Sequence, residues 1–147
     1  MRGDDTEQPS LFSVVGLEDR VPPDHPLRAV KNLANRALRR MDRLFDQIYV
    51  DHGRVSIPPE RLLRALLLQI LYSVRSERML MEQINYNLLF RWFIGLGIDE
   101  PVWHPTTFSK NRDRFLEGDV AQEFLRQIVK EASAAGLEVI SKGRSTI

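Results

Sequence analysis

The stretch from residue 106 to residue 114 carries hydroxyl and cationic side chains of the kinds that contact DNA. Threonine and serine hydroxyls can bind base edges or phosphates, and lysine and arginine can bind guanine or the backbone. Lys110 and Arg114 are one helical turn apart, so a helix would present both on one face. The candidate contacts are Thr106, Thr107, Ser109, Lys110, Arg112 and Arg114. The spacing alone is at least as typical of an amphipathic helix with a solvated side.

Two further groups of cations lie earlier in the chain. Arg75 and Arg78 are weaker candidates for phosphate contacts. A longer cationic strip occupies the polar side of a helix predicted to begin at Pro26, and Asp42 and Asp46 offset it only in part. Its members are Arg28, Lys31, Arg36, Arg39, Arg40 and Arg43. A solvated helix face is the simpler interpretation of this strip.

Residue types that carry out catalysis are poorly placed in this sequence. His25, His52 and His104 are far apart and in no metal-ligand spacing, so we interpret each as a turn or cap residue. A pair of magnesium ions would need carboxylates gathered on strand ends, and the sequence predicts almost no sheet. The sequence has no glycine-rich phosphate loop, no serine nucleophile motif and no cysteine. We therefore expect no enzymatic activity, no metal and no cofactor in this chain.

The elements that position these residues should form one helical domain. With 147 residues, 43% of them hydrophobic and 28% charged, the chain can bury one real core. Its net charge of +1 gives no overall nucleic-acid signal, so only local clusters of cations count. Residues 1–10 are acidic and polar and lack the basic segment followed by an apolar segment that makes a signal peptide. The most apolar stretch, 62–74, is too short to span a bilayer. Together with the lack of cysteine, this favours a cytoplasmic location and no membrane partner.

Apolar residues recur at intervals of three and four, which predicts an all-α fold, a compact multi-helix bundle. The first helix is expected from Pro26 to Ile48, and the helix at 62–72 is apolar nearly all round and should be central. Further helices are expected at 77–85 with Ser76 as N-cap, at 87–96 ending at Gly95, at 106–116 and at 119–135. The inward residues of the first helix should be Leu27, Val30, Ala34, Ala37, Met41, Leu44 and Ile48, and those of the last Val120, Phe124, Ile128 and Ala132, with Leu125 and Val129 alongside.

The later helices have the layout of a helix-turn-helix, whose second helix enters the major groove. The helix at 106–116 would be the second one, with Phe108, Asn111 and Phe115 facing inward. The connection from Gly97 to Pro105 is longer than the three or four residues of a standard turn. The pattern therefore predicts a helix-turn-helix-like unit with an extended connection.

Several blocks of the sequence together resemble the insertion-sequence-five family of transposases. The blocks are IPPERLLRALLLQ at 57–69, LYSVRSER at 71–78, MEQI at 81–84, YNLLFRWFIGL at 86–96 and TTFSKNRDRF at 106–115. QPSLF at 8–12 and DHPLR at 24–28 also fit. The resemblance covers about residues 8–136, and the block at 106–115 is similar to the recognition-helix region of that family.

The resemblance implies a DNA-binding domain at residues 24–136 that binds the terminal inverted repeats of a mobile element in double-stranded DNA, after a loosely ordered lead at 1–23. In that family an RNase H-like domain with an Asp-Asp-Glu triad and magnesium follows. Residues 137–147 would be the truncated start of that domain, with one short strand at Leu137–Ile140. In the family this strand carries the first catalytic aspartate, and Val139–Thr146 contains none. We therefore expect a truncated or frameshifted copy, or a separately encoded N-terminal piece, that binds DNA without phosphodiester chemistry of its own. An enzyme would be expected only if frameshifting continues the product past Ile147.

Two alternatives stay open. The chain could be an interaction fragment that pairs with full-length transposase, or with itself, through its apolar helices and inhibits transposition. It could also be a remnant without a selected role. A mobility shift on the flanking inverted repeat distinguishes DNA binding from the first alternative.

Overall fold

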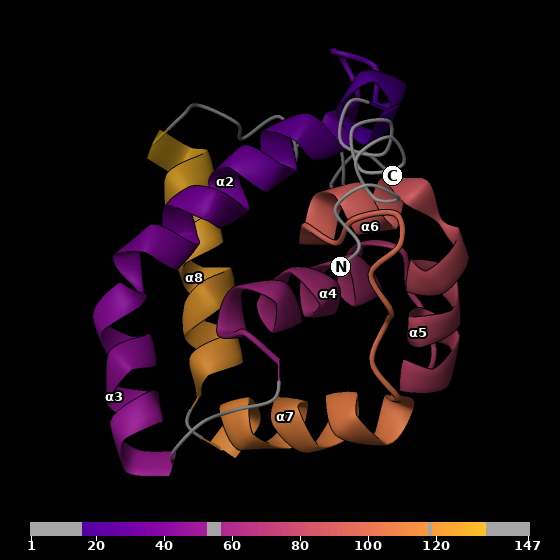
Figure 1. The fold of residues 1–147 in the computed structure, drawn as a ribbon. Helices are drawn as coiled ribbons and strands as arrows, with labels where there is room; N and C mark the ends of the chain where they lie inside the picture. The colour runs from indigo at the N-terminus through magenta and orange to yellow at the C-terminus, as the bar shows by residue number, and fades with distance from the viewer. Residues whose placement is uncertain (1–15, 53–56, 118, 135–147) are drawn as a thin grey trace, which may run out of the picture.

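The computed structural model describes residues 16–52, 57–117 and 119–134, and all the regular structure in these ranges is helical (Figure 1). The predicted all-α class is therefore confirmed. The predicted strand at 137–140 and the tail to residue 147 lie outside the described residues. A short helical segment at residues 16–20 comes first. The helices after it are α2 (Pro26–Arg40), α3 (Asp42–His52), α4 (Pro59–Leu71), α5 (Glu77–Tyr86), α6 (Leu88–Ile94), α7 (Pro105–Glu117) and α8 (Val120–Ala134).

Local sequence signals set several of the helix ends. Ser76 is the N-cap of α5, where its side chain accepts a hydrogen bond from the Met79 N–H at 3.1 Å. Asn87 caps α6 in the same way, by accepting from two N–H groups of its first turn. Gly95 ends α6 with a φ of 100°, a left-handed conformation that glycine adopts without steric cost. The predicted cap at Ser76 and stop at Gly95 are thus confirmed.

The single helix predicted from Pro26 to Ile48 is in fact two helices, because the chain bends at Met41. Met41 has φ −95° and ψ 8°, and its N–H bonds to carbonyl oxygens of the last turn of α2. Met41 and Phe45 are each only 3% exposed. Leu44, which the predicted stripe included, is only half-buried. At the start of α3, Phe45 is therefore the buried apolar side chain in place of the predicted Leu44.

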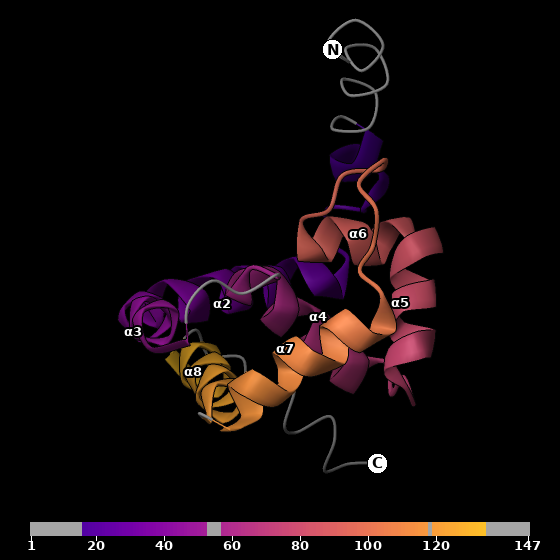
Figure 2. The ribbon, with the colours of Figure 1, turned by 60° about the horizontal axis from the view of Figure 1, so that its bottom comes forward.

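α4 is the central helix, and the other helices surround it (Figure 1). It packs against α6 and α7, and α5 contacts both of these helices. α8 packs across α2 and also meets α7, which crosses the lower part of the view in Figure 2. The largest fully buried side chains come from these helices and from Ile57, two residues before α4; they are Ile57, Leu62, Leu63, Leu68, Leu80, Ile84, Phe93, Ile94, Phe108, Val120 and Phe124.

Two helices leave apolar side chains on the surface, against the prediction. α4 was expected to be covered on several sides, but Ile70 and Leu71 in its last turn are 57% and 46% exposed. On α8, Val129 was expected beside the core and is 64% exposed, whereas Glu131 is only 7% exposed. The hydrophobic pattern therefore predicted that these two helices exist, but it wrongly predicted that Ile70, Leu71 and Val129 are covered.

The packed helical unit begins before residue 24, within the segment expected to be a loose lead. Leu17 is 8% exposed. The Trp92 indole N–H donates to Glu18 Oε1 at 2.9 Å, and Arg28 binds the other oxygen of this carboxylate at 2.7 Å. These contacts hold the segment at 16–20 against α2 and α6.

Candidate nucleic-acid interface

α7 carries most of the residues that the sequence suggested for DNA contacts. It packs against α4, α5 and α8. Phe108 is fully buried and lies 6.3 Å from the Trp103 ring in a stacked arrangement. Asn111 is 5% exposed, and its amide donates to the Thr107 carbonyl oxygen at 2.8 Å. The predicted inward orientation of Phe108 and Asn111 is therefore confirmed, and the side chain of Phe115 lies outside the described residues.

The opposite side of α7 faces solvent. Its exposed residues are Thr106, Lys110, Asp113 and Arg114, which we call the α7 exposed face. At about 100° per residue, these positions fall on one side of the helix, away from Phe108. Thr107 and Ser109 are half-buried at its borders. The face therefore combines two of the predicted cations with one hydroxyl and one carboxylate, which leaves it positively charged.

The prediction that Arg112 lies on this outer side is wrong. Its side chain is 28% exposed and forms an ion pair with Glu77 of α5. A second guanidinium N–H donates to the Asp113 carboxylate at 3.0 Å. Because Arg112 follows Phe108 by four residues, helical geometry turns both toward the packed side. Its guanidinium therefore joins α7 to α5.

The ion pair between Arg112 and Glu77 also brings Arg75 and Arg78 close to α7. Both arginines are exposed, and in sequence they stand on either side of Glu77, which Arg112 holds against α7. The structure therefore brings the start of α5 next to the second half of α7, with exposed cations on each. Neighbouring cations add to the local positive potential that attracts phosphates.

The connection between α6 and α7 is not the tight turn of a helix-turn-helix, and that motif is not confirmed. Residues 95–104 run as a long segment from α6 to the start of α7 (Figures 1 and 2). α7 makes its main contacts with α5, α8 and α4. The position of α7 therefore depends on three helices and on how this connection is held.

Two arginines hold the connection in place, a role that the sequence analysis missed. Arg91 is 3% exposed and donates to the carbonyl oxygens of Gly97 and Glu100. Arg61 donates to the Gly95 carbonyl oxygen at 2.9 Å and to the Glu100 carboxylate at 3.0 Å. Burial raises the pKa of Glu100, but hydrogen bonds from Gly97 N–H and Arg61 outweigh burial and hold the pKa below its ordinary value. The available signal was an arginine inside the apolar run of α6, since a buried charge needs partners.

The cationic strip predicted on the first helix divides into two parts. Arg28 and Lys31 lie over the Trp92 ring, 5.1 Å and 4.2 Å from its centroid. The Lys31 ammonium also donates to the Trp92 carbonyl oxygen at 2.8 Å, and burial lowers its pKa. These two cations are therefore engaged inside the fold. The exposed part of the strip is Arg36, Arg39, Arg40 and Arg43.

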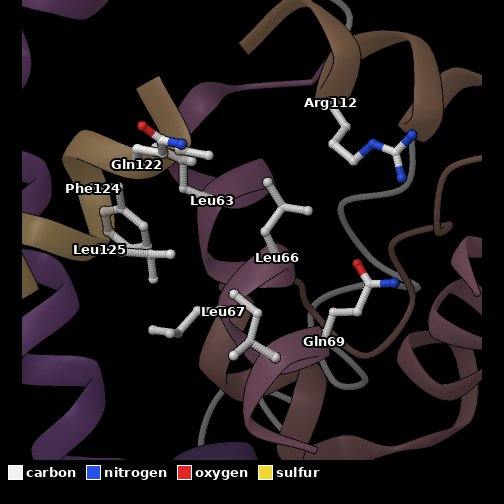
Figure 3. A pocket seen from close by; sticks show the side chains of 10 residues that line it. Leu63, Leu66, Leu67, Gln69, Arg112, Gln122, Phe124 and Leu125 are labelled. Atoms are coloured by element: carbon white, nitrogen blue, oxygen red, sulfur yellow. The ribbon is translucent and has the colours of Figure 1, made fainter. Parts of the chain in front are cut away.

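An apolar groove of about 270 Å³ lies between α4 and α8 (Figure 3). Its apolar lining consists of Leu63, Leu66, Leu67, Ile70, Ala121, Phe124 and Leu125. Figure 3 shows Arg112, Gln69 and Gln122 around it as the polar neighbours. An apolar lining with few polar groups suits the packing of another apolar side chain.

Among the residues that the structure describes, no group of three or more histidine, aspartate or glutamate side chains is placed so that it could hold a metal ion. His25 and His104 act as local caps, since Nδ1 of each accepts a backbone hydrogen bond from the residue two positions later, at 3.0 and 3.1 Å. The side chain of His52 lies outside the described residues. None of the described helices has the length and apolar character needed to cross a bilayer.

The sequence matches a known family model, the transposase domain (DUF772), over residues 15–114. The match runs from just before the helical segment at 16–20 into α7 and includes all the candidate contacts on α7 and α5. No curated protein and no solved structure gives a significant match.

Proposed function

Because the chain belongs to the transposase domain family (DUF772), we propose that its helical part binds double-stranded DNA at the terminal inverted repeats of a mobile element. The finer assignment, to the insertion-sequence-five family, rests on the sequence blocks at 57–96 and 106–115. The proposed DNA-binding domain is residues 24–136, with the segment at 16–20 packed onto it. DNA recognition, and not DNA cutting, is the role proposed for these residues.

The observation that carries this proposal is the α7 exposed face. Lys110 and Arg114 are exposed one turn apart, and Thr106 lies one turn before them. Among the side chains that the structure describes, neither cation is held in an ion pair. Such cations can displace the counterions of DNA phosphates without first breaking an internal contact.

The side chains on this face and at its borders differ in length, so they would make different contacts with DNA. Lys110 and Arg114 are long enough to reach phosphates or guanine edges, and the hydroxyls of Thr106, Thr107 and Ser109 make shorter contacts with bases or phosphates. Arg75 and Arg78 extend the positive surface from the start of α5. In this arrangement Arg112 supports α7 from its packed side.

The test compares the affinity of the chain for duplexes copied from the DNA that flanks its gene with its affinity for scrambled duplexes. We expect tighter binding to a flanking sequence. Lys110→Ala/Arg114→Ala should weaken that binding and lower the slope of log affinity against log salt by about two. The control is Arg20→Ala/Arg126→Ala, which removes the same charge from exposed positions elsewhere and should leave the slope unchanged; Arg126 is paired with Glu123 of its own helix. Equal affinity for flanking and scrambled duplexes, or equal slopes for the two variants, would reject the proposal.

A second candidate function is association with another copy of this chain. Ile70, which lines the groove between α4 and α8, is 57% exposed, and Val129 on α8 is 64% exposed; these exposed apolar side chains favour it. Analytical ultracentrifugation over a range of concentrations tests it. A dimer that Ile70→Lys abolishes would support this function, and a monomer at every concentration would exclude it.

A further inference from the structure

A hollow of about 320 Å³ opens between the end of α2 and α8, and arginines dominate its lining. The lining residues are Arg36, Arg39, Arg40 and Glu131. The three arginines are exposed, whereas Glu131 is buried. Three cations against one carboxylate leave the hollow with a net positive charge.

Only one of the three guanidinium groups is engaged by the carboxylate. Arg40 Nε donates to Glu131 in an ion pair between α2 and α8. Among the described side chains, Arg36 and Arg39 are in no ion pair. Each presents a planar fork of N–H donors, the geometry that suits phosphate oxygens. Two guanidinium groups at this hollow are therefore available to an anion.

α2 also has a charge content that solvation alone does not explain. Its sequence, PLRAVKNLANRALRR, contains five cations and no acid, although the whole chain is nearly balanced, with 21 Lys and Arg against 20 Asp and Glu. Arg28 and Lys31 are engaged at Trp92, so the cations of α2 left exposed are Arg36, Arg39 and Arg40. Helix stability accounts for Arg39 and Arg40, since cations in the last turn of a helix favour its dipole. It does not account for Arg36, which lies a turn earlier. A merely solvated surface normally mixes both signs, so the segregated cations point to a polyanionic partner.

We propose that Arg36, Arg39 and Arg40 form a second DNA-contacting surface, which binds phosphates of the duplex backbone without reading sequence. This inference rests on the proposed function and adds a surface to it. Residues three and four apart on a helix have Cβ atoms about 5–6 Å apart. Arg36 and its partners in the next turn can therefore contact successive phosphates of one strand.

The hollow and the α7 exposed face belong to opposite ends of α8. Glu131 is near the end of α8, whereas α7 leads into its beginning, about 16 Å away along the helix axis at 1.5 Å per residue. The two surfaces are therefore separate in the fold, so each can be tested by its own variant.

The test is a salt titration of binding to a fluorescent mixed-sequence duplex of about two helical turns. Arg36→Ala/Arg39→Ala should lower the slope of log affinity against log salt by about two, because each lost phosphate contact contributes about 0.9. The loss should be the same for flanking and scrambled duplexes, so that their affinity ratio stays unchanged. Arg40 is kept in this variant, because its removal would unpair the buried Glu131. Arg20→Ala/Arg126→Ala again controls for the loss of net charge.

The results separate this inference from the proposed function. If α7 does not bind DNA, Lys110→Ala/Arg114→Ala leaves binding unchanged while Arg36→Ala/Arg39→Ala still lowers the slope. If the inference is wrong, the α2 variant keeps the slope of the unaltered chain or matches the control. Stronger binding through these arginines to anionic phospholipid vesicles or to single-stranded RNA than to the duplex would also overturn it.

Discussion

At the scale of single residues, the arginines of this chain divide into those that hold the fold and those that face solvent. Arg91 is almost fully buried, and Arg112 is largely covered by its contact with Glu77. Arg40 combines both roles, since its side chain is 65% exposed while its Nε binds a buried carboxylate. The number of cations in a segment therefore does not show how many of them are free to bind a partner, because Arg91 and Arg112 are engaged within the fold.

Arg112 should matter for stability more than for DNA binding. Arg112→Ala leaves the Glu77 carboxylate partly buried and unpaired, which should cost about 1–3 kcal/mol of unfolding free energy. Arg114→Ala, at an exposed position two residues on, should change stability by no more than about 0.5 kcal/mol. Urea denaturation measures both effects. A drop of about one in the salt slope of DNA binding for Arg112→Ala, without loss of stability, would mean that Arg112 contacts DNA.

Arg40 and Arg39 offer a matched comparison in the last turn of α2. Both favour the helix dipole equally, but only Arg40 is paired with Glu131, whose side chain is 9% exposed. Arg40→Ala should therefore be less stable than Arg39→Ala by about 1–3 kcal/mol, measured by urea denaturation. Adding Glu131→Gln to Arg40→Ala should restore part of the loss, because the unpaired charge disappears. Equal stabilities of the two single variants would show that the ion pair contributes nothing.

At the scale of elements, α7 is positioned by its contacts with α4, α5 and α8 and by the connection at 95–104. This connection stands where a helix-turn-helix has a tight turn. The connection is held through Glu100, which binds both Arg61 and the Gly97 N–H. The Gly97 N–H donates to this carboxylate at 2.8 Å. Charge on Glu100 therefore contributes to the placement of the helix that carries the proposed DNA-binding face.

This arrangement predicts an acid-sensitive contribution to stability. The pKa of Glu100 in the folded chain lies below its ordinary value of 4.5, so its carboxylate stabilises the fold above that pH and the contribution is lost as the pH falls through the folded value. Glu100→Gln should melt at a lower temperature than the parent at neutral pH, and the difference should shrink below pH 4.5. Thermal melts over this pH range measure it, with Glu82→Gln on α5 as the control for the loss of one acidic side chain. A difference that stays constant over the whole range would contradict the prediction.

The helix ends at Ser76 and Gly95 could be predicted from the sequence because their causes are local, whereas the break at Met41 was missed. Ser76 and Gly95 act through hydrogen bonds and backbone angles within one turn. The contacts that fix α7 and α2 are not local: Glu77 and Arg112 are 35 positions apart, and Arg40 and Glu131 are 91 apart. Helical spacing places Arg112 one turn after the buried Phe108, but the sequence did not show that Glu77 of α5 would be its partner.

At the scale of the whole molecule, stability should depend on the covered turns of α4 and not on its exposed end. Leu68 is fully buried, whereas Ile70 is 57% exposed. Leu68→Ala should cost about 2–5 kcal/mol through lost burial and a cavity, and Ile70→Ala, the control on the same helix, should cost less than about 1 kcal/mol. Chemical denaturation followed by circular dichroism measures both. Similar losses for the two variants would mean that the groove side of α4 is covered in solution.

α8 lies beyond the stretch that matches the transposase family, which ends at residue 114. Yet α8 packs against α2, and its Phe124 is 1% exposed. A polypeptide stopped at residue 114 would lack Val120 and Phe124 of the hydrophobic core and would leave the part of α2 that packs against α8 open to water. The family match and the packed core therefore have different borders here, because the core includes residues of α8.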